Sequence, residues 1–81
     1  MKVDIKFFGM LEEAVMKSEE IMEFENCDKI SLHDIHEIIK NKNPKLKQYN
    51  YKIAVNHKIT SEDIIINNNT EIALLPPFAG G

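Results

Sequence analysis

The chain has 81 residues, of which 28% are charged, and a formal net charge of −3. A chain this short forms one small domain, and its negative charge argues against nucleic acid as the main partner. No apolar run approaches the ~20 residues of a membrane-spanning helix, and the first residues lack a stretch of signal-peptide length, so we expect a cytoplasmic protein with no membrane partner.

The first residues predict a strand that is buried on one side. Apolar residues at positions 3, 5 and 7 alternate with charged residues at positions 2, 4 and 6, which is the period of a half-buried strand. Phe8 breaks the alternation, because it is a large aromatic residue on the polar side, and Gly9 ends the strand. Apolar residues at helical spacing then predict a short helix or helical turn between Met10 and Lys17.

A second strand is predicted over residues 19–25, where Met22 and Phe24 point inward and glutamates point outward. Ile21 falls on the outer side, where the pattern gives it no role. Cys27 is the only cysteine, so the chain can form no internal disulfide. It is either a reactive thiol or an ordinary, partly buried cysteine.

The best-marked helix begins at Ser31. The Ser31 hydroxyl can cap the first turn, and Asp34 stands where an acidic residue completes a capping box and suits the helix dipole. Pro44 prevents the helix from continuing. One side of the helix is apolar and predicts the face that packs on a sheet; it carries Leu32, Ile35, Ile38 and Ile39.

Residues 51–56 predict a third strand, with Tyr51, Ile53 and Val55 on its apolar side. The chain then turns back into a short strand at residues 59–60. Residues 56–58 predict the turn between them.

The last strand is predicted over residues 70–75. The asparagines at 67–69 make the turn before it, because asparagine tolerates left-handed backbone. Ile72 and Leu74 point inward, and the prolines at 76–77 end the strand. Together the elements predict a two-layer α+β domain in which one main amphipathic helix covers the apolar face of a sheet of four to five strands.

The chain ends in Gly80-Gly81. At an average glycine usage of about 7%, a given dipeptide is Gly-Gly in roughly 0.5% of cases. Neither glycine has a side chain that could act, so any chemistry at this end must occur on the carboxylate of Gly81. The absence of Cβ atoms lets the end enter a narrow channel, and Pro76 and Pro77 stiffen its exit from the domain. The alternative is a frayed terminus with incidental glycines.

We therefore divide the chain into a domain over residues 1–75 and a flexible, extended tail over residues 76–81. Phe78 is an apolar residue in this tail. It could anchor the tail in a pocket on a partner protein.

The whole chain resembles the ubiquitin-like β-grasp sulfur carriers, and among them the small subunits of molybdopterin synthase. The resemblance rests on residues 3–9 (VDIKFFG), residues 54–56 (AVN) and residues 71–81 (EIALLPPFAGG). The specific part is Leu-Pro-Pro-x-x-Gly-Gly at the end. Where this family usually carries a Gly-Asp pair before the last strand, the present chain has Asn68-Asn69-Thr70, which can serve the same turn.

The resemblance implies a mixed sheet whose first and last strands are parallel neighbours. It also implies that a ubiquitin-activating-like enzyme uses ATP to adenylate the Gly81 carboxylate, and that a sulfur donor then displaces AMP to leave a thiocarboxylate. The sulfur passes to a pterin precursor in the large synthase subunit during molybdenum cofactor biosynthesis. On this interpretation the chain is a sulfur carrier and not an enzyme by itself. It binds no cofactor tightly, and it assembles as a heterotetramer of two small and two large subunits.

Parallel first and last strands would bring Phe8 and Leu75 together at their C-terminal ends, both on the outer side of the sheet. We expect them to form an apolar patch beside the exit of the tail, because exposed apolar clusters usually mark partner sites. The alternative is that Phe8 folds under a loop. The resemblance adds Ile59 to this patch, and the tail adds residues 76–79. The expected partner contacts are therefore Phe8, Ile59, Leu75, Pro76, Pro77, Phe78 and Ala79.

Two further groups of residues are candidates for a role. His33 and His36 lie three residues apart on the predicted helix, but no cysteine or carboxylate pair of metal-site spacing accompanies them, so we expect no metal site. No acidic residue stands between Glu37 and Glu62. The lysines in this interval form either a solvated face or a docking surface for an acidic protein partner; they are Lys40, Lys42, Lys45, Lys47, Lys52 and Lys58.

Three other functions fit the same residues. The chain could be a small protein modifier that is joined through Gly81 to lysines of its targets. It could be a sulfur carrier for thiamine thiazole synthesis, although those carriers usually lack the Pro-Pro step. It could also be a β-grasp binding module with an inert tail.

Overall fold

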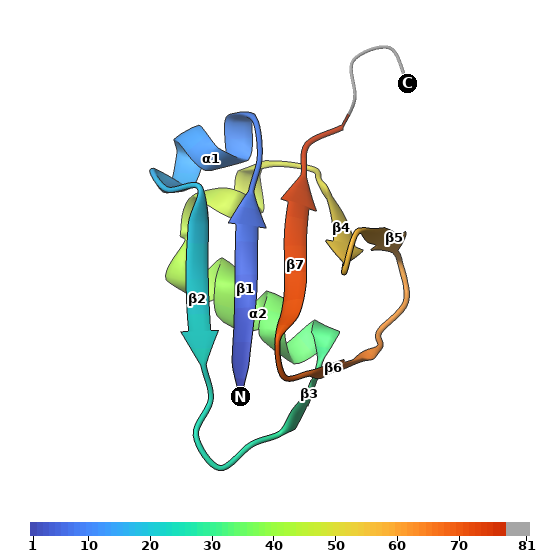
Figure 1. Ribbon diagram of the computed structural model, residues 1–81. Coiled ribbons are helices and arrows are strands. Elements are labelled where there is room, and N and C mark those ends of the chain that lie inside the picture. The colour runs from blue at the N-terminus through green and yellow to red at the C-terminus, as the bar shows by residue number, and fades with distance from the viewer. Residues whose placement is uncertain (78–81) are drawn as a thin grey trace.

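The computed structural model describes residues 1–77 and contains a five-stranded sheet in the order β2-β1-β7-β4-β5 (Figure 1). The elements in chain order are β1 (Lys2–Phe7), α1 (Met10–Val15), β2 (Glu19–Glu23), β3 (Lys29–Ser31), α2 (Leu32–Lys42), the 3₁₀ helix η1 (Pro44–Gln48), β4 (Lys52–Val55), β5 (Lys58–Thr60), β6 (Ile65–Asn67) and β7 (Thr70–Leu75).

The first and last strands form the centre of the sheet. β1 and β7 pair in parallel, with Val3 opposite Thr70 and Phe7 opposite Leu74. β2 joins β1 and β4 joins β7, both antiparallel, so the sheet is mixed, as the resemblance implies. Because β1 and β7 run in the same direction, their C-terminal ends meet at one end of the sheet (Figure 1). We call this the exit end.

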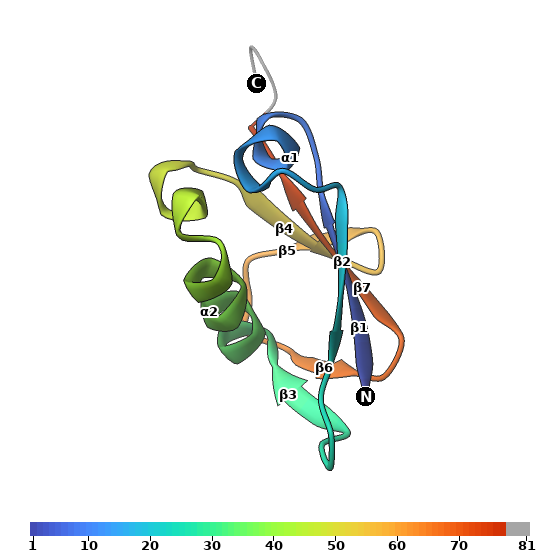
Figure 2. The ribbon, with the colours of Figure 1, turned by 90° about the vertical axis from the view of Figure 1, so that its left-hand side faces the viewer.

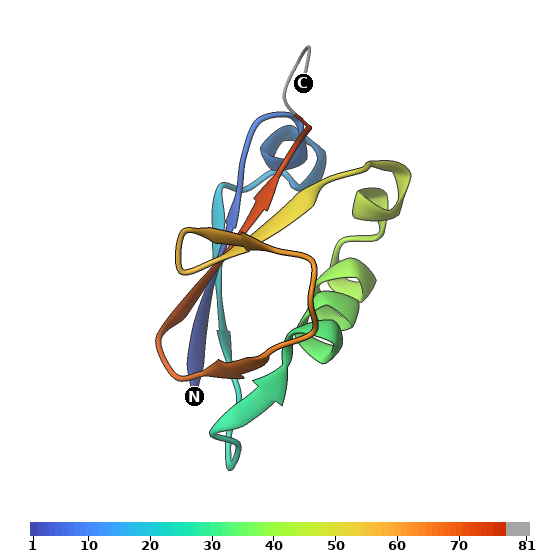
Figure 3. The same cartoon turned by 90° about the vertical axis from the view of Figure 1, so that its right-hand side faces the viewer.

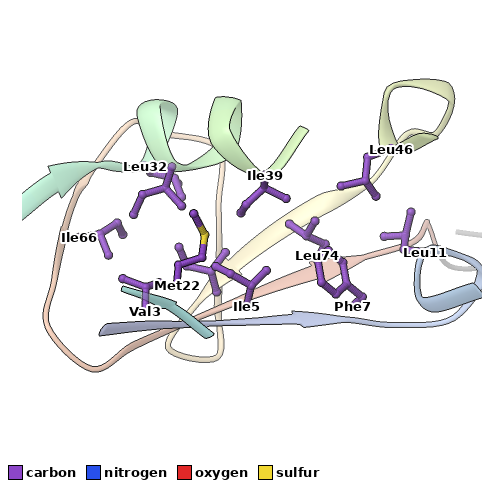
Figure 4. Close-up of a cluster of buried hydrophobic side chains, with 12 residues drawn as sticks. Val3, Ile5, Phe7, Leu11, Met22, Leu32, Ile39, Leu46, Ile66 and Leu74 are labelled. Carbon is purple, nitrogen blue, oxygen red and sulfur yellow. The ribbon is translucent and has the colours of Figure 1, made fainter. Parts of the chain in front are cut away.

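The inner face of the sheet packs against α2 (Figure 2). The predicted alternation of β1 is confirmed, because Val3, Ile5 and Phe7 are buried, with exposed fractions of 0%, 1% and 2%. Ile72 and Leu74 of β7 lie opposite Ile5 and Phe7 and are fully buried with them. Figure 4 shows the labelled side chains of this core between the sheet, α2 and η1. Each fully buried aliphatic side chain contributes about 1.5–3 kcal/mol, so this face is the main source of stability.

The predicted helix begins and ends where the sequence indicates. Ser31 Oγ accepts a hydrogen bond of 3.1 Å from the backbone N–H of Asp34, and this N-cap satisfies one of the free donors of the first turn. α2 ends at Lys42, before Pro44. The apolar stripe packs on the sheet, with Leu32, Ile35 and Ile39 buried and Ile38 partly buried.

The predicted turns are present, and their positive φ angles account for the asparagines in them. Asn56 and His57, with φ of 48° and 72°, form the two-residue turn of the β4–β5 hairpin, which Figure 3 shows at the sheet edge. Positive φ at both positions suits the right-handed twist of hairpin strands. Asn69, with φ of 63°, completes the turn from β6 into β7.

Three short elements were not predicted. β3 and β6 pair antiparallel in a separate two-stranded sheet, which places Ile30 opposite Ile66 at the end of the core away from the exit end (Figures 1 and 3). η1 follows Pro44, and its Leu46 is completely buried. These elements complete the core at its two ends.

Smaller differences concern the second and third strands. β2 ends at Glu23, although Phe24 still donates its backbone N–H to Met1 O at 2.8 Å and is partly buried. In β4, the outward-pointing Ala54 is also buried, because its side chain is small and lies between neighbouring strands. Within residues 1–77, no helix combines the length and apolar character needed to cross a membrane.

Candidate functional site

The outer face of the sheet carries large apolar side chains at the exit end. Phe7 and Leu74 are paired and buried on the inner face, so the next residue of each strand, Phe8 and Leu75, points to the outer face. The N–H of Phe8 donates a hydrogen bond of 3.3 Å to Leu74 O, so the hydrogen bonding between β1 and β7 continues as far as Phe8. Phe8 is 44% exposed, so it does not fold under a loop. The structure therefore places the predicted pair together at the base of the tail.

The register of the sheet brings Ile59 to the same face. Ile59 lies opposite Ala54, and Ala54 lies opposite Ala73, which points outward between two inward residues of β7. Ile59 is 52% exposed. The two alanines are almost buried and form a flat floor between the larger side chains. We define the exit patch as Phe8, Ile59 and Leu75 with this floor of Ala54 and Ala73.

The base of the tail packs against the turn that follows β1. Gly9 has a φ of 57°, where residues with a side chain are strained, and a Cβ added there would lie 2.9 Å from Pro76 Cγ. Glycine is therefore required both by the backbone conformation and by the close approach of the proline. Pro76 is half-buried against this turn, whereas Pro77 is exposed. The chain thus leaves β7 in contact with the end of β1.

The remaining predicted site residues are Phe78, Ala79, Gly80 and Gly81, and they lie outside the described residues. The part of the site that the structure describes ends at Pro77. The chemistry expected at the carboxylate of Gly81 therefore stays a prediction.

A charged network lies on the outer face beside the exit patch. Lys6 Nζ is 2.9 Å from one carboxylate oxygen of Glu71, and His57 Nε2 is 3.3 Å from the other. The hydrogen bond to Glu71 raises the pKa of Lys6, and the same bond lowers the pKa of Glu71. A hydrogen bond with Asp4 raises the pKa of Glu19 on β2. This network bounds the exit patch on the side away from the tail.

The lysines between residues 40 and 58 do not act as one group. Lys40 pairs with Glu37 at 3.2 Å, and Lys42 pairs with Glu20. The others are exposed and form no ion pair with any residue in the described range 1–77; they are Lys45, Lys47, Lys52 and Lys58. Sequence alone could not predict the ion pair of Lys42, because Glu20 comes from a distant strand.

The histidine and cysteine candidates are tied into local hydrogen bonds. His36 Nε2 and the Tyr51 hydroxyl are 2.6 Å apart in a groove of about 530 Å³ beside the start of α2. Burial lowers the pKa of His36 and raises that of Tyr51. Cys27 is partly buried, and its thiol donates to Lys29 O at 3.1 Å. Among residues 1–77, no three metal-binding side chains lie close enough together to hold an ion.

The chain is similar to several solved structures over its whole length. A protein assigned as subunit 1 of a molybdopterin converting factor from Pyrococcus furiosus is 26% identical, with a TM-score of 0.78 over 96% of this chain and 99% of that one. The small archaeal modifier protein SAMP1 from Haloferax volcanii is 16% identical, with a TM-score of 0.82 over 100% of both chains. A complex of subunits 1 and 2 of the molybdopterin-converting factor from Helicobacter pylori contains a chain that is 24% identical, with a TM-score of 0.71 over 100% of both.

These likenesses confirm the ubiquitin-like β-grasp fold that the sequence predicts. No curated protein sequence matches the chain. The profile of the ThiS family matches residues 5–81, which is nearly the entire sequence. The chain therefore belongs to the ThiS family.

Proposed function

We propose that the chain is the sulfur-carrying small subunit of molybdopterin synthase, which docks through the exit patch and reacts through the carboxylate of Gly81. Membership of the ThiS family over residues 5–81 and the 26% identity to the Pyrococcus furiosus subunit support this proposal. The observation that carries it is the exit patch at the base of the tail. Phe8 and Ile59 are large apolar residues that the fold leaves exposed, which is typical of partner-binding surfaces.

The proposed chemistry begins with activation of the tail. An α-carboxylate, with a pKa of about 3.5, is ionised at neutral pH and is a poor electrophile. One of its oxygens attacks the α-phosphorus of ATP in a partner adenylating enzyme, and pyrophosphate leaves. A hydrosulfide equivalent from a sulfur donor then attacks the carbonyl carbon, so that a C–S bond forms, AMP leaves and Gly81 becomes a thiocarboxylate.

The second half of the cycle transfers this sulfur. The thiocarboxylate sulfur attacks a carbon of a pterin precursor in the large subunit, so that a C–S bond forms and an oxygen leaving group departs from that carbon. Water then cleaves the acyl C–S bond of the resulting thioester, which leaves the sulfur on the pterin and releases the tail as a carboxylate. The Helicobacter pylori neighbour was solved together with a second subunit of its converting factor, and we extend that kind of assembly to this chain. The resemblance favours a heterotetramer of two small and two large subunits.

Within this scheme the exit patch binds the partner and positions the start of the tail, while the partners supply the reactive groups. The exit patch lies on β4, β5 and β7 and on Phe8, the residue that follows β1, so strands of one sheet hold it in place. Pro76 is held against Gly9, which fixes where the tail begins relative to the patch. A partner that covers the patch therefore receives the tail at a defined position.

The proposal can be tested by intact mass spectrometry of the protein purified from its own cells. A thiocarboxylate replaces one oxygen by sulfur, so a fraction of the protein should be heavier by that exchange. Incubation with ATP, the partner adenylating enzyme and a sulfur source should increase this fraction. Only unmodified protein after that incubation would refute the carrier function.

A single residue appended after Gly81 makes a sharper test. It moves the carboxylate and adds a side chain to an end that must enter a narrow site, so sulfur transfer should be abolished. The fold should be unaffected, which the circular dichroism spectrum and the urea midpoint would check. Retained transfer would exclude chemistry at the carboxylate of Gly81.

Conjugation to other proteins is the second candidate function, favoured by the TM-score of 0.82 to SAMP1. It uses the same activated carboxylate, but the acceptor is a lysine amine and the product is an isopeptide bond. Mass spectrometry of digested cell protein would reveal lysines joined to Gly81. A carrier for thiamine thiazole synthesis would form the thiocarboxylate as well, but would deliver its sulfur to thiazole and not to a pterin.

A further inference from the structure

The exit end of the molecule carries lysines that the fold does not use. Lys45 and Lys47 lie on η1, and Lys52 lies at the first position of β4. All three are exposed, and none forms an ion pair with the residues that the structure describes. We call them the exit lysines.

The burial of Leu46 determines where two of these lysines lie. Leu46 is 0% exposed and belongs to the same core cluster as Leu11 of α1, which follows the end of β1. Figure 4 shows both side chains at the same end of the core as Phe7. With Leu46 turned inward, its neighbours Lys45 and Lys47 are left on the surface of that end.

Lys52 connects this charged surface to the exit patch. It lies opposite Leu75 in the antiparallel pairing of β4 with β7, so both residues point to the outer face. A protein that covers Leu75 therefore also meets the ammonium group of Lys52. Lys52 and the exit patch are therefore neighbours on the outer face, whereas Lys45 and Lys47 lie at the same end of the molecule on η1, which packs against α2.

The acidic residues at this end do not neutralise the exit lysines. Glu20 is occupied by Lys17 and Lys42. Burial alone would raise the pKa of Glu20, but the hydrogen bonds from these two lysines outweigh it and lower the pKa. Glu12 and Glu13 of α1 are exposed and form no ion pair within residues 1–77.

We infer that the exit lysines bind acidic side chains on the second subunit, at the rim of the interface that the exit patch forms. This inference rests on the proposed function. Charges at the rim of an interface mainly speed association and set orientation, whereas a buried apolar centre supplies most of the affinity. A carrier that must meet one partner after another needs fast association, and unpaired lysines around the tail exit provide it by steering.

The test compares two double variants with the same change in net charge. Lys45→Glu with Lys47→Glu reverses charge at the exit end. Lys29→Glu with Lys58→Glu is the matched control, because these lysines are also exposed and form no ion pair among residues 1–77. Lys29 is on β3 and Lys58 follows the turn at the opposite end of β4 from Lys52.

Association of the full chain with the second subunit would be measured by stopped-flow fluorescence at two salt concentrations. At ~0.05 M salt the exit variant should associate at least about tenfold more slowly than the wild type, and the control should stay within about twofold. At ~1 M salt, where the Debye length is about 3 Å, this difference should vanish. Circular dichroism would verify that both variants are folded.

Three results would overturn the inference. Equal slowing by both double variants would mean that only net charge matters, and no slowing by either would mean that the exit lysines are merely solvated. If the exit variant is adenylated more slowly by the adenylating enzyme but binds the second subunit as the wild type does, the exit lysines serve the adenylating enzyme and not the second subunit. If the wild type itself does not bind the second subunit, the proposed function fails together with the inference; if it binds and the lysines have no effect, only the inference fails.

Discussion

The two faces of the central sheet are built from the same strands but are used differently. On the inner face, β1 contributes side chains that are at most 2% exposed, whereas Phe8, one residue beyond, is 44% exposed on the outer face. Every large apolar residue of the inner face contacts another element of the fold. Within residues 1–77, Phe8 and Ile59 are outside this core and largely exposed. A substitution on the inner face thus tests stability, and one in the exit patch tests the proposed binding.

The strongest test of this comparison uses neighbouring leucines on opposite faces. Leu74→Ala removes a fully buried side chain and should cost about 2–5 kcal/mol, a large part of the ~5–15 kcal/mol that a small domain has. Leu75→Ala, on the outer face, should cost less than ~1 kcal/mol. Urea unfolding of both variants would measure the two losses, and equal losses would contradict the division between the faces.

The second test addresses binding at the outer face. Phe8→Asp places a charge in the exit patch and should weaken binding to the second subunit at least about tenfold, or ~1.4 kcal/mol, with little effect on the urea midpoint. Ile21→Asp is the matched control, because Ile21 is 59% exposed and lies opposite Asp4, away from the patch. Isothermal titration calorimetry would compare the two. Undiminished binding by Phe8→Asp would remove the patch from the proposal.

A smaller effect is expected at the helix that covers the inner face. Ser31→Ala removes the N-cap hydrogen bond to Asp34 N–H and should lower the free energy of unfolding by about 1 kcal/mol. Ser31→Asp keeps an acceptor and should restore most of this loss. An alanine variant as stable as the wild type would show that the cap does not contribute.

The smallest effect is a dependence of stability on pH. Burial lowers the pKa of His36, so the unfolded chain takes up a proton before the folded protein does as the pH falls. The contribution of neutral His36 is therefore complete above its unfolded pKa of about 6.5 and is lost as the pH falls from there toward the folded pKa. His36→Gln should flatten the decline in urea midpoint between pH 7 and 5, whereas His33→Gln, at an exposed position, should not. Equal slopes for both variants would contradict this assignment.

Local signals in the sequence predicted the parts of the fold that depend on local physics. The alternation around Ile5 and the cap at Ser31 are properties of a few neighbouring residues, and both are confirmed. Leu46 stands alone between lysines, so no periodicity marks it as buried. β3 and β6 have three residues each, which is too short for a pattern, and their pairing joins segments far apart in the chain.

The candidate site was partly predictable for the same reason. The outward positions of Phe8 and Leu75 follow from strand parity, so they could be derived once the parallel pairing was implied. The exposure of these two side chains could not be derived, because it depends on which parts of the sheet the other elements of the fold cover. Lys42 forms an ion pair and Lys45 forms none within residues 1–77, and this difference depends on where Glu20 of the distant strand β2 lies.

The close contact between Gly9 and Pro76 has a consequence for the partners. It fixes the start of the tail beside the exit patch, and the six residues from Pro76 to Gly81 can span at most about 20 Å when fully extended. Under the proposed function, every active site that acts on the Gly81 carboxylate must therefore lie within that distance of the surface that holds the patch. Enzymes with unrelated chemistry would share one upper limit on the distance between docking surface and reaction centre.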